Sequence, residues 1–280
     1  MRVALTISGL DRIFGADLDR VLELARAADA ADVHQLVLPD HVAIGPRLDR
    51  YPFAEQFPYP PEEPWLEPLT TLAAIAAVTE RTRLATGILI APARPAVLLA
   101  KTAATLDVLS RGRLDLGLGP GWQREELAAT GVAYEDRVSR LDDTARACRA
   151  LWNEEPPVRF TSATVSFDAL WCEPRPVQPG GVPLWFAGPA TETTARRIAE
   201  LGVGWLPIAG TPVDDIARGV ALIREELERA GRDPAILEVR AGGKPEELAA
   251  AGVTVLGVAL SRTISALDDA LAFVETLAPR

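Results

Sequence analysis

The stretch TRLATGILIAPARPAVLLAKTAATLDVLSRGRLDLGLGPGW, residues 82–122, decides the fold. Its apolar runs predict a strand over 83–90 and another over 113–118, and apolar residues at helical spacing over 99–109 predict a helix between them. The second strand ends in spaced glycines, Gly117-Leu118-Gly119-Pro120-Gly121, followed by Trp122. Ligands of parallel βα proteins bind at the carboxyl ends of the strands, and a turn without Cβ atoms lets a flat or phosphorylated molecule lie against backbone. The stretch therefore predicts a βα fold and the place of its binding site.

The same alternation of strand and helix continues on both sides of this stretch. Strands are predicted over 3–7, 35–39, 83–90, 113–118, 184–187, 203–206, 237–240 and 254–259, with helical spacing between them. A loop rich in proline and aromatic residues at 40–66, and a small hairpin with a proline-rich linker at 156–180, interrupt the rhythm. Eight strands in 280 residues predict an α/β fold, one (β/α)8 TIM-barrel domain over residues 1–280 with insertions after strands 2 and 4.

A doubly wound sheet is the competing arrangement. The glycines after Leu116 do not satisfy G-x-G-x-x-G, because position 122 is Trp, and they do not follow the first strand. The dinucleotide-binding fold is therefore disfavoured.

Composition excludes several classes of function. No run of eighteen apolar residues is present, and the first residues do not form a signal peptide, so we expect no membrane partner. A net charge of −10 without a basic run disfavours nucleic acid. Two cysteines suit a reducing cytoplasm, and two histidines cannot build a multi-histidine metal site, so we expect no metal. The remaining expectation is a cytoplasmic protein, in a homodimer, that binds a small molecule.

Candidate chemistry lies at the predicted strand ends. His41 directly follows the second strand, where it could serve as a general acid or base, or anchor the loop base. His34 precedes that strand and is expected at the opposite end of the barrel. The aromatic residues of the 40–66 loop predict a lid or substrate wall, with a dimer contact as the alternative: Tyr51, Phe53, Phe57, Tyr59 and Trp65.

Two further strand ends carry weaker signals. The turn 187–191 joins the fifth strand to a helix start, where backbone N–H groups and the Thr191 hydroxyl predict an anion site; an ordinary capped loop is the alternative. Thr211 is predicted to cap the next helix, with Pro212 in its first position. Arg240 and Lys244 are expected to be solvated charges, and an anion contact at the barrel rim is the alternative.

Several motifs together resemble the luciferase-like oxidoreductases, which use FMN or the deazaflavin coenzyme F420. The matching stretches are LPDH (38–41), EPLTTLAAIAAVTERTRLATGILI (67–90), LLAKTAATLDVLSRGRLDLGLGPGW (98–122), LDDTARACRALW (141–152), EPRPVQP (173–179), PLWFAG (183–188) and AELGVGWLP (199–207). The chain looks most similar to the F420-dependent branch, in which Asp-His ends the second strand as Asp40-His41 does here. The last seventy residues resemble the family only in their alternation of predicted strands and helices.

The resemblance implies a set of site residues. His41 would lie near the deazaflavin ring as the catalytic group, and Gly87-Ile88 would form the bulge, often a non-proline cis peptide, that backs the ring. The other implied cofactor contacts are Asp40 at the strand end, Gly119, Pro120 and Gly121 along the ring, and Gly188, Ala190 and Thr191 at the phosphate. Trp65 and Trp122 would line the substrate pocket, and Trp122 stands where the sugar-phosphate dehydrogenases of this branch carry an acid, which disfavours that substrate.

The sequence thus predicts an enzyme, an F420-dependent oxidoreductase that transfers a hydride between the deazaflavin and a small organic substrate. An FMN-dependent luciferase-like monooxygenase that uses O₂ is the first alternative, because the bound cofactor decides the reaction. A non-catalytic barrel that binds flavin or another ligand is the second.

Overall fold

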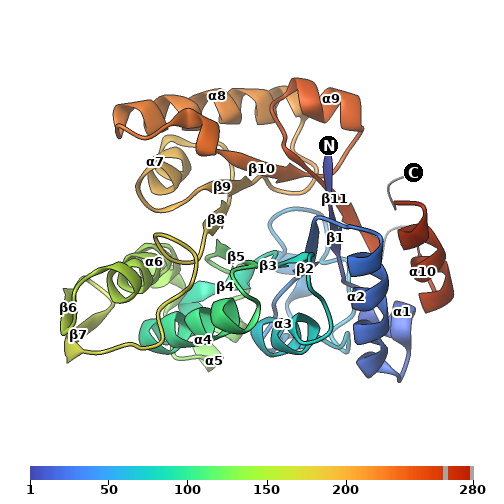
Figure 1. The fold of residues 1–280 in the computed structure, drawn as a ribbon, viewed down its shortest axis with the longest axis horizontal. Coiled ribbons are helices and arrows are strands. Elements are labelled where there is room, and N and C mark those ends of the chain that lie inside the picture. Colours follow the sequence, from blue (N-terminus) through green and yellow to red (C-terminus); the bar gives the residue numbers. More distant parts are fainter. Residues whose placement is uncertain (261–263, 278–280) are drawn as a thin grey trace.

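The computed structural model describes residues 1–260 and 264–277, and its main feature is a closed parallel barrel (Figure 1). The strands follow one another in the order β3-β2-β1-β11-β10-β9-β8-β5-β4, and β3 also pairs with β5, which closes the sheet. The barrel strands are β1 (Arg2–Thr6), β2 (Gln35–Leu38), β3 (Arg83–Thr86), β4 (Leu89–Ile90), β5 (Leu114–Gly119), β8 (Leu184–Ala187), β9 (Gly204–Leu206), β10 (Glu238–Ala241) and β11 (Val255–Ala259). Gly87 and Ile88 separate β3 from β4, which together fill one of eight barrel positions. The predicted (β/α)8 barrel is confirmed.

Strands β2 and β5 are buried on both faces, as expected for a parallel sheet covered by helices. Every residue of β2 and of β5 is buried. Along β2, Leu36 and Leu38 belong to the large core beneath the helices, whereas Val37 belongs to a separate small cluster. That cluster joins residues from around the barrel: Ala4, Val37, Ala85, Trp185, Leu206 and Val255. Because neighbouring side chains on a strand point to opposite faces, this small cluster is the packed barrel interior.

The helices form the outer layer (Figure 1). They are α1 (Leu10–Phe14), α2 (Val21–Ala30), α3 (Pro68–Ala76), α4 (Ala96–Leu109), α5 (Arg124–Ala129), α6 (Arg137–Asn153), α7 (Glu192–Leu201), α8 (Val213–Arg229), α9 (Pro245–Ala250) and α10 (Leu267–Glu275). Helix α4 packs on α6, α7 packs on α8, and α10 packs on α2. No helix in the described part of the chain is long and apolar enough to cross a membrane.

The two interruptions of the βα rhythm lie where the sequence predicts them. Residues 40–66 form a loop after β2 whose only helical part is the short 3-10 turn Leu48–Arg50. Strands β6 (Val158–Thr161) and β7 (Ser166–Leu170) form the antiparallel hairpin, which lies beyond α6 and away from the barrel (Figure 1).

The predicted cap of α8 is wrong by one residue. The helix begins at Val213 after Pro212, and the Thr211 hydroxyl donates to the Ile208 carbonyl at 2.7 Å. A hydroxyl that closes a local turn in this way competes with capping.

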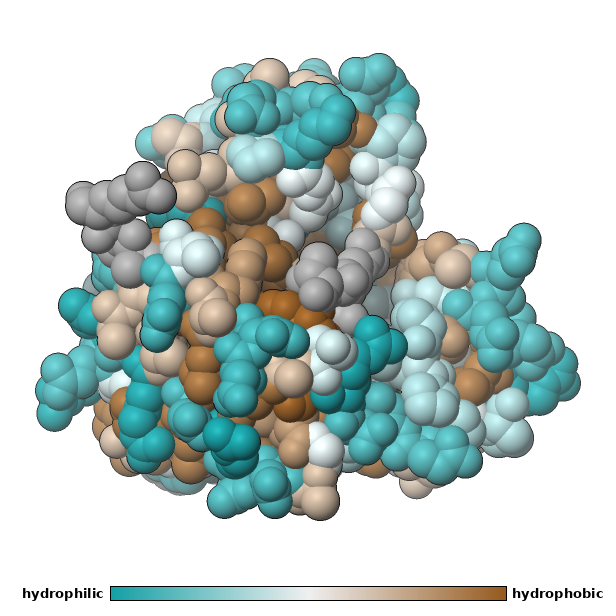
Figure 2. Space-filling view, turned by 90° about the vertical axis from the view of Figure 1, so that its right-hand side faces the viewer, coloured by the Kyte–Doolittle hydropathy of each residue, from teal (hydrophilic) through white to brown (hydrophobic). Residues whose placement is uncertain are grey.

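The helical layer is thinnest beside β10 and β11, where only the short α9 connects the two strands. Most of β11 is half-buried. Figure 2 shows apolar surface in the middle of the face at the right-hand side of Figure 1, between hydrophilic surfaces above and below.

Candidate active site

A cavity of about 330 Å³ opens at the carboxyl ends of the barrel strands. Residues from the ends of β5 and β8 and from α6 and α7 form most of its wall, and Phe53, Ile88 and Ile208 complete it from the loops that follow other strands. Its apolar lining consists of Phe53, Ile88, Trp122, Val138, Leu141, Ala187 and Ile208, and its remaining residues are Gly119, Pro120, Gly121, Gly188, Pro189, Thr191, Thr193, Thr194 and Arg197. Seven residues of the predicted site line this one cavity: Ile88, Gly119, Pro120, Gly121, Trp122, Gly188 and Thr191.

The glycine turn after β5 shapes one wall of this cavity. Gly121 has φ 77°, and a Cβ atom there would lie 2.9 Å from Cγ2 of Ile90. A side chain at this position would therefore be strained and would collide with β4. The peptide bond between Gly87 and Ile88 is cis, as the family resemblance implies, and the Ile88 side chain reaches the cavity. Backbone and one aliphatic side chain thus form a flat apolar wall.

Polar groups gather at the other end, where α7 begins. The Thr191 hydroxyl caps the helix by accepting from the Thr194 N–H at 3.2 Å, and the two threonine hydroxyls lie 3.1 Å apart. Arg197 on the same helix is buried and pairs with Asp142, with 3.1 Å between Nη2 and Oδ2. Hydroxyls, a helix N-terminus and a guanidinium form an environment that suits an anionic group.

His41 lies beside the cavity and is held by a buried carboxylate. Its Nδ1 lies 3.0 Å from Oε2 of Glu126, and the exposed fractions of the two side chains are 8% and 1%. The other oxygen of Glu126 accepts from the N–H groups of Val42 at 2.6 Å and Ala43 at 3.3 Å. A carboxylate only accepts hydrogen bonds, so Nδ1 carries the proton and Nε2 stays free of this pair. Glu126 therefore fixes both the ring of His41 and the base of the loop.

Aromatic rings surround His41. Its ring centroid lies 4.9 Å from that of Trp65, 5.2 Å from that of Phe57 and 6.2 Å from that of Trp122. Trp122 lines the cavity and also contacts the ring of His41, so it lies between the cavity and the histidine. The Trp65 indole N–H is buried and finds no acceptor among the described residues. Trp65 does not line the cavity, and a substrate contact by this residue stays a prediction from the sequence.

Three predicted site residues lie behind the cavity wall. Asp40 is buried and ties β2 to the segment after β4, because it accepts from the Ile90 N–H at 2.8 Å and from Arg94 Nη1 at 2.6 Å. Burial alone would lower the pKa of Arg94, but its contacts with Asp40 and Glu67 raise it overall. Ala190 packs against the core, and Gly87 faces the barrel interior. Cofactor contacts by these three residues stay predictions from the sequence.

Several residues of the site have no clear signal in the sequence. Glu126 follows Trp122 by about one helical turn, and no spacing rule connects it to His41, 85 positions away. Gln123 fixes the loop through Gly45, whose N–H donates to its Oε1 at 2.7 Å. Arg240, expected at the surface, is buried in the barrel interior, because its side chain points inward from β10. In the part of the chain that the structure describes, no cluster of histidine, cysteine or acidic residues could hold a metal ion.

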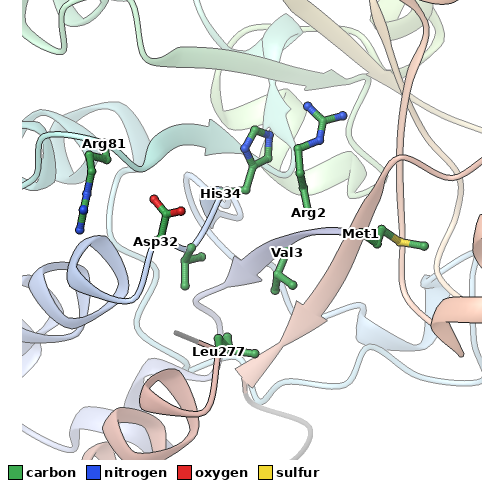
Figure 3. A pocket seen from close by; sticks show the side chains of 8 residues that line it. Met1, Arg2, Val3, Asp32, His34, Arg81 and Leu277 are labelled. Atoms are coloured by element: carbon green, nitrogen blue, oxygen red, sulfur yellow. The ribbon is translucent and has the colours of Figure 1, made fainter. Parts of the chain in front are cut away.

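A second pocket, of about 280 Å³, opens at the amino ends of the strands (Figure 3). Its lining includes Arg2, Asp32, His34 and Arg81, together with Met1, Val3, Val33 and Leu277. Arg2 is paired with Glu238, and Arg81 contacts the backbone carbonyl of Asp29. Burial, and then the charge of Arg2, lower the pKa of His34. The basic groups at this end are thus engaged in the packing of the barrel base.

The sequence profile of the luciferase-like monooxygenases matches residues 4–246. The chain belongs to this family. It is 35% identical over 272 residues to an uncharacterised protein of Mycobacterium tuberculosis, covering 94% of this chain and 95% of that one.

Solved structures of the family have the same barrel. Monooxygenase RslO1 from Streptomyces bottropensis superposes with a TM-score of 0.78 at 22% identity, covering 99% of this chain and 97% of that one. The coenzyme F420 dependent tetrahydromethanopterin reductase from Methanopyrus kandleri superposes with a TM-score of 0.72 at 15% identity, covering 99% and 98%. The luciferase-like family contains oxidoreductases and monooxygenases, so the barrel is that of a redox enzyme family whose structural neighbours include F420-dependent members.

Proposed function

We propose that this chain is an F420-dependent oxidoreductase, which transfers a hydride between a bound deazaflavin and a small organic substrate. One observation carries the proposal: a single cavity joins the Gly119–Gly121 turn, Ile88 and the Thr191 end, with the His41–Glu126 pair one aromatic ring away. The flat apolar wall suits a deazaflavin ring, and the hydroxyls at the start of α7 suit its phosphate. The F420-dependent reductase among the structural neighbours supports this choice of cofactor.

The deazaflavin, when bound, supplies the hydride donor or acceptor. The residues of this chain supply binding, orientation and a proton. Ile88 and the glycine turn, which line the cavity, would support the ring, and Thr191 would bind the phosphate. His41 moves a proton at Nε2, because Glu126 occupies Nδ1 and can balance a positive charge on the imidazole. Trp122, which lines the cavity, would separate the substrate from bulk water, and the unpaired indole N–H of Trp65 would be available to a substrate oxygen that reaches the surroundings of His41.

The aromatic loop favours a lid over a dimer contact. Tyr51 and Phe57 both pack against Trp122, with ring centroids 5.2 Å and 5.3 Å away, so the loop's rings turn toward the site. We further propose that the protein acts on a small molecule in the cytoplasm and that it is a homodimer. Sedimentation of the purified protein tests the oligomeric state.

The experiment that tests the proposal is hydride transfer from chemically reduced F420 to a panel of ketones, aldehydes and activated alkenes, without O₂. The expected result is re-oxidation of F420 by at least one substrate in wild type and its loss in His41→Ala. Turnover with reduced FMN and O₂, but none with reduced F420, would contradict the proposal. If the protein binds F420 but turns over no substrate in either direction, the hypothesis of a non-catalytic ligand-binding barrel is supported instead.

The FMN-dependent monooxygenase is the second candidate. The apolar lining of the cavity favours it, because a water-poor pocket protects a reduced flavin during its reaction with O₂. The monooxygenase from Streptomyces bottropensis, which superposes over nearly the whole chain, also supports it. Consumption of O₂ in the presence of substrate and reduced FMN is the measurement that would establish it.

A further inference from the structure

Arg240 lies inside the barrel, directly behind the bulge between β3 and β4. Its Nη2 donates to the Thr86 carbonyl at 3.3 Å. A Cβ atom on Gly87 would lie 2.9 Å from that same Nη2 and 2.4 Å from Cγ1 of Val37. Only glycine lets the chain approach so closely, and the guanidinium therefore lies directly against the bulge. The next residue of the bulge, Ile88, lines the cavity, whereas Arg240 does not.

The charges around Arg240 do not balance. Asp115 is bound bidentately by Arg83, at 2.7 Å from Nε and 2.6 Å from Nη2. Arg240 reaches Asp115 only through Gln35, which accepts from Arg240 Nη1 at 2.7 Å and donates to Asp115 at 2.6 Å. The carboxylate is thus taken up by Arg83, and Arg240 forms no ion pair with any residue that the structure describes.

Arg240 keeps its charge at neutral pH in spite of its burial. Loss of hydration lowers the pKa of Arg240 to about 10, and the charge of Asp115 acts in the opposite direction. The Trp185 ring lies 5.6 Å from the guanidinium carbon. A neutral side chain could fill the same space and hydrogen-bond to Thr86 and Gln35 without the cost of burying a charge. The cation–π contact with Trp185 is therefore the only feature of the packing that favours a cation over a neutral side chain among the described residues.

We propose that Arg240 acts through the bulge as a charge behind the cofactor ring, and that it makes the protein bind reduced cofactor more tightly than oxidised cofactor. This inference rests on the proposed function. A hydride is one proton with two electrons, so the ring gains one unit of negative charge when it accepts one from the substrate, which is oxidised. A fixed cation behind the ring favours this more negative reduced form over the oxidised form. Arg240 does not touch the reacting atoms; it is an electrostatic positioning residue.

The test is the ratio of two dissociation constants, for reduced and for oxidised F420, measured without O₂ by fluorescence titration. Arg240→Gln removes the charge but keeps hydrogen-bonding groups, and Arg240→Met keeps only the apolar bulk. In each variant we expect the preference for reduced F420, measured as the ratio of the dissociation constants of oxidised and reduced F420, to fall about tenfold. Val37→Ala is the matched control, because Val37 also touches Gly87 but carries no charge. It should change both dissociation constants by similar factors and leave their ratio within about twofold of wild type.

The outcomes separate this inference from the function on which it rests. If wild type binds F420 and the ratio is unchanged in both Arg240 variants, Arg240 supports only the packing of the bulge and the inference is overturned. A ratio that falls equally in Val37→Ala would overturn it too, since the effect would then come from shape and not from charge. If wild type binds neither redox form of F420, the proposed function fails and the inference fails with it.

Discussion

The two histidines of the chain stand before and after the same strand, and their surroundings differ in every respect that matters for chemistry. His34 precedes β2 at the base of the barrel, where burial and then the charge of Arg2 lower its pKa, and no carboxylate holds its ring in the described part of the chain. His41 follows β2 at the mouth, where Glu126 holds Nδ1 and aromatic rings enclose the imidazole. The comparison teaches that the end of the strand, more than the residue type, decides which histidine can work as an acid or base.

The largest expected effect is at the mouth of the barrel. His41→Ala should reduce hydride transfer by about 10²-fold or more, because the proton then has no positioned donor or acceptor. His34→Ala is the matched control and should leave turnover within about twofold of wild type. Steady-state rates, with circular dichroism as the check on folding, measure both. An equal loss of turnover in the two variants would contradict the distinction between the two ends of β2. Unchanged turnover in His41→Ala would contradict it too and would favour His41 as an anchor of the loop.

Trp122 should show the next largest effect. It is half-buried and lies between the cavity and His41, so Trp122→Ala should lower turnover by about tenfold or more while cofactor affinity changes much less. Separate measurements of kcat and of the cofactor dissociation constant test this. If Trp122 only packs beneath α5, the variant should instead lose stability. A variant that is stable and fully active would contradict both roles.

A smaller effect is expected where α7 begins. Thr191→Ala should weaken cofactor binding by about 1.5–3 kcal/mol, because it removes the hydroxyl that we propose as a donor to the charged phosphate. The same hydroxyl caps α7, so stability should also fall by about 1 kcal/mol. Thr191→Ser keeps the hydroxyl and should restore both properties, as titration at fixed salt and thermal unfolding will show. Equal affinity of the Ala variant and wild type would mean that the phosphate binds elsewhere.

The smallest effect concerns the base of the barrel and depends on pH. Burial, and then the charge of Arg2, lower the pKa of His34 below the ordinary histidine value of 6.5, so the unfolded chain takes up this proton before the folded one does as the pH falls. The stability that neutral His34 contributes is therefore complete above pH 6.5 and is lost as the pH falls below it. His34→Gln should show a weaker decline of Tm between about pH 7 and pH 5.5 than wild type does. Parallel curves for the two proteins would contradict this.

The sequence predicts the barrel well because each strand, helix and loop is determined largely by residues within its own segment. The apolar run of β5 and the prolines of the 40–66 loop each report the structure of their own segment. The glycine turn and the start of α7 are predicted for the same reason, since backbone geometry restricts the residues that fit there.

Contacts between segments far apart in the chain leave no such signal. Glu126 reaches His41 across 85 positions, and Arg240 reaches Gln35 across 205. Only the closed barrel brings these partners together, so the sequence gives Arg240 as a surface charge and does not connect Glu126 with the site. The position of Asp40 is predicted, but its tie to Arg94 depends on how the chain folds back after β4.

The central claim is that the cavity at the mouth of the barrel binds deazaflavin, and its most direct test is a titration of the purified protein with oxidised F420 and with FMN. Val138 lines the cavity from the surface of α6, so Val138→Trp fills it with little risk to folding, and Ser139→Trp adds the same bulk to the exposed neighbouring position. The account predicts saturable binding of F420, about tenfold tighter than that of FMN, lost in Val138→Trp and retained in Ser139→Trp. Binding of F420 that survives in Val138→Trp, or no binding by wild type, would contradict it.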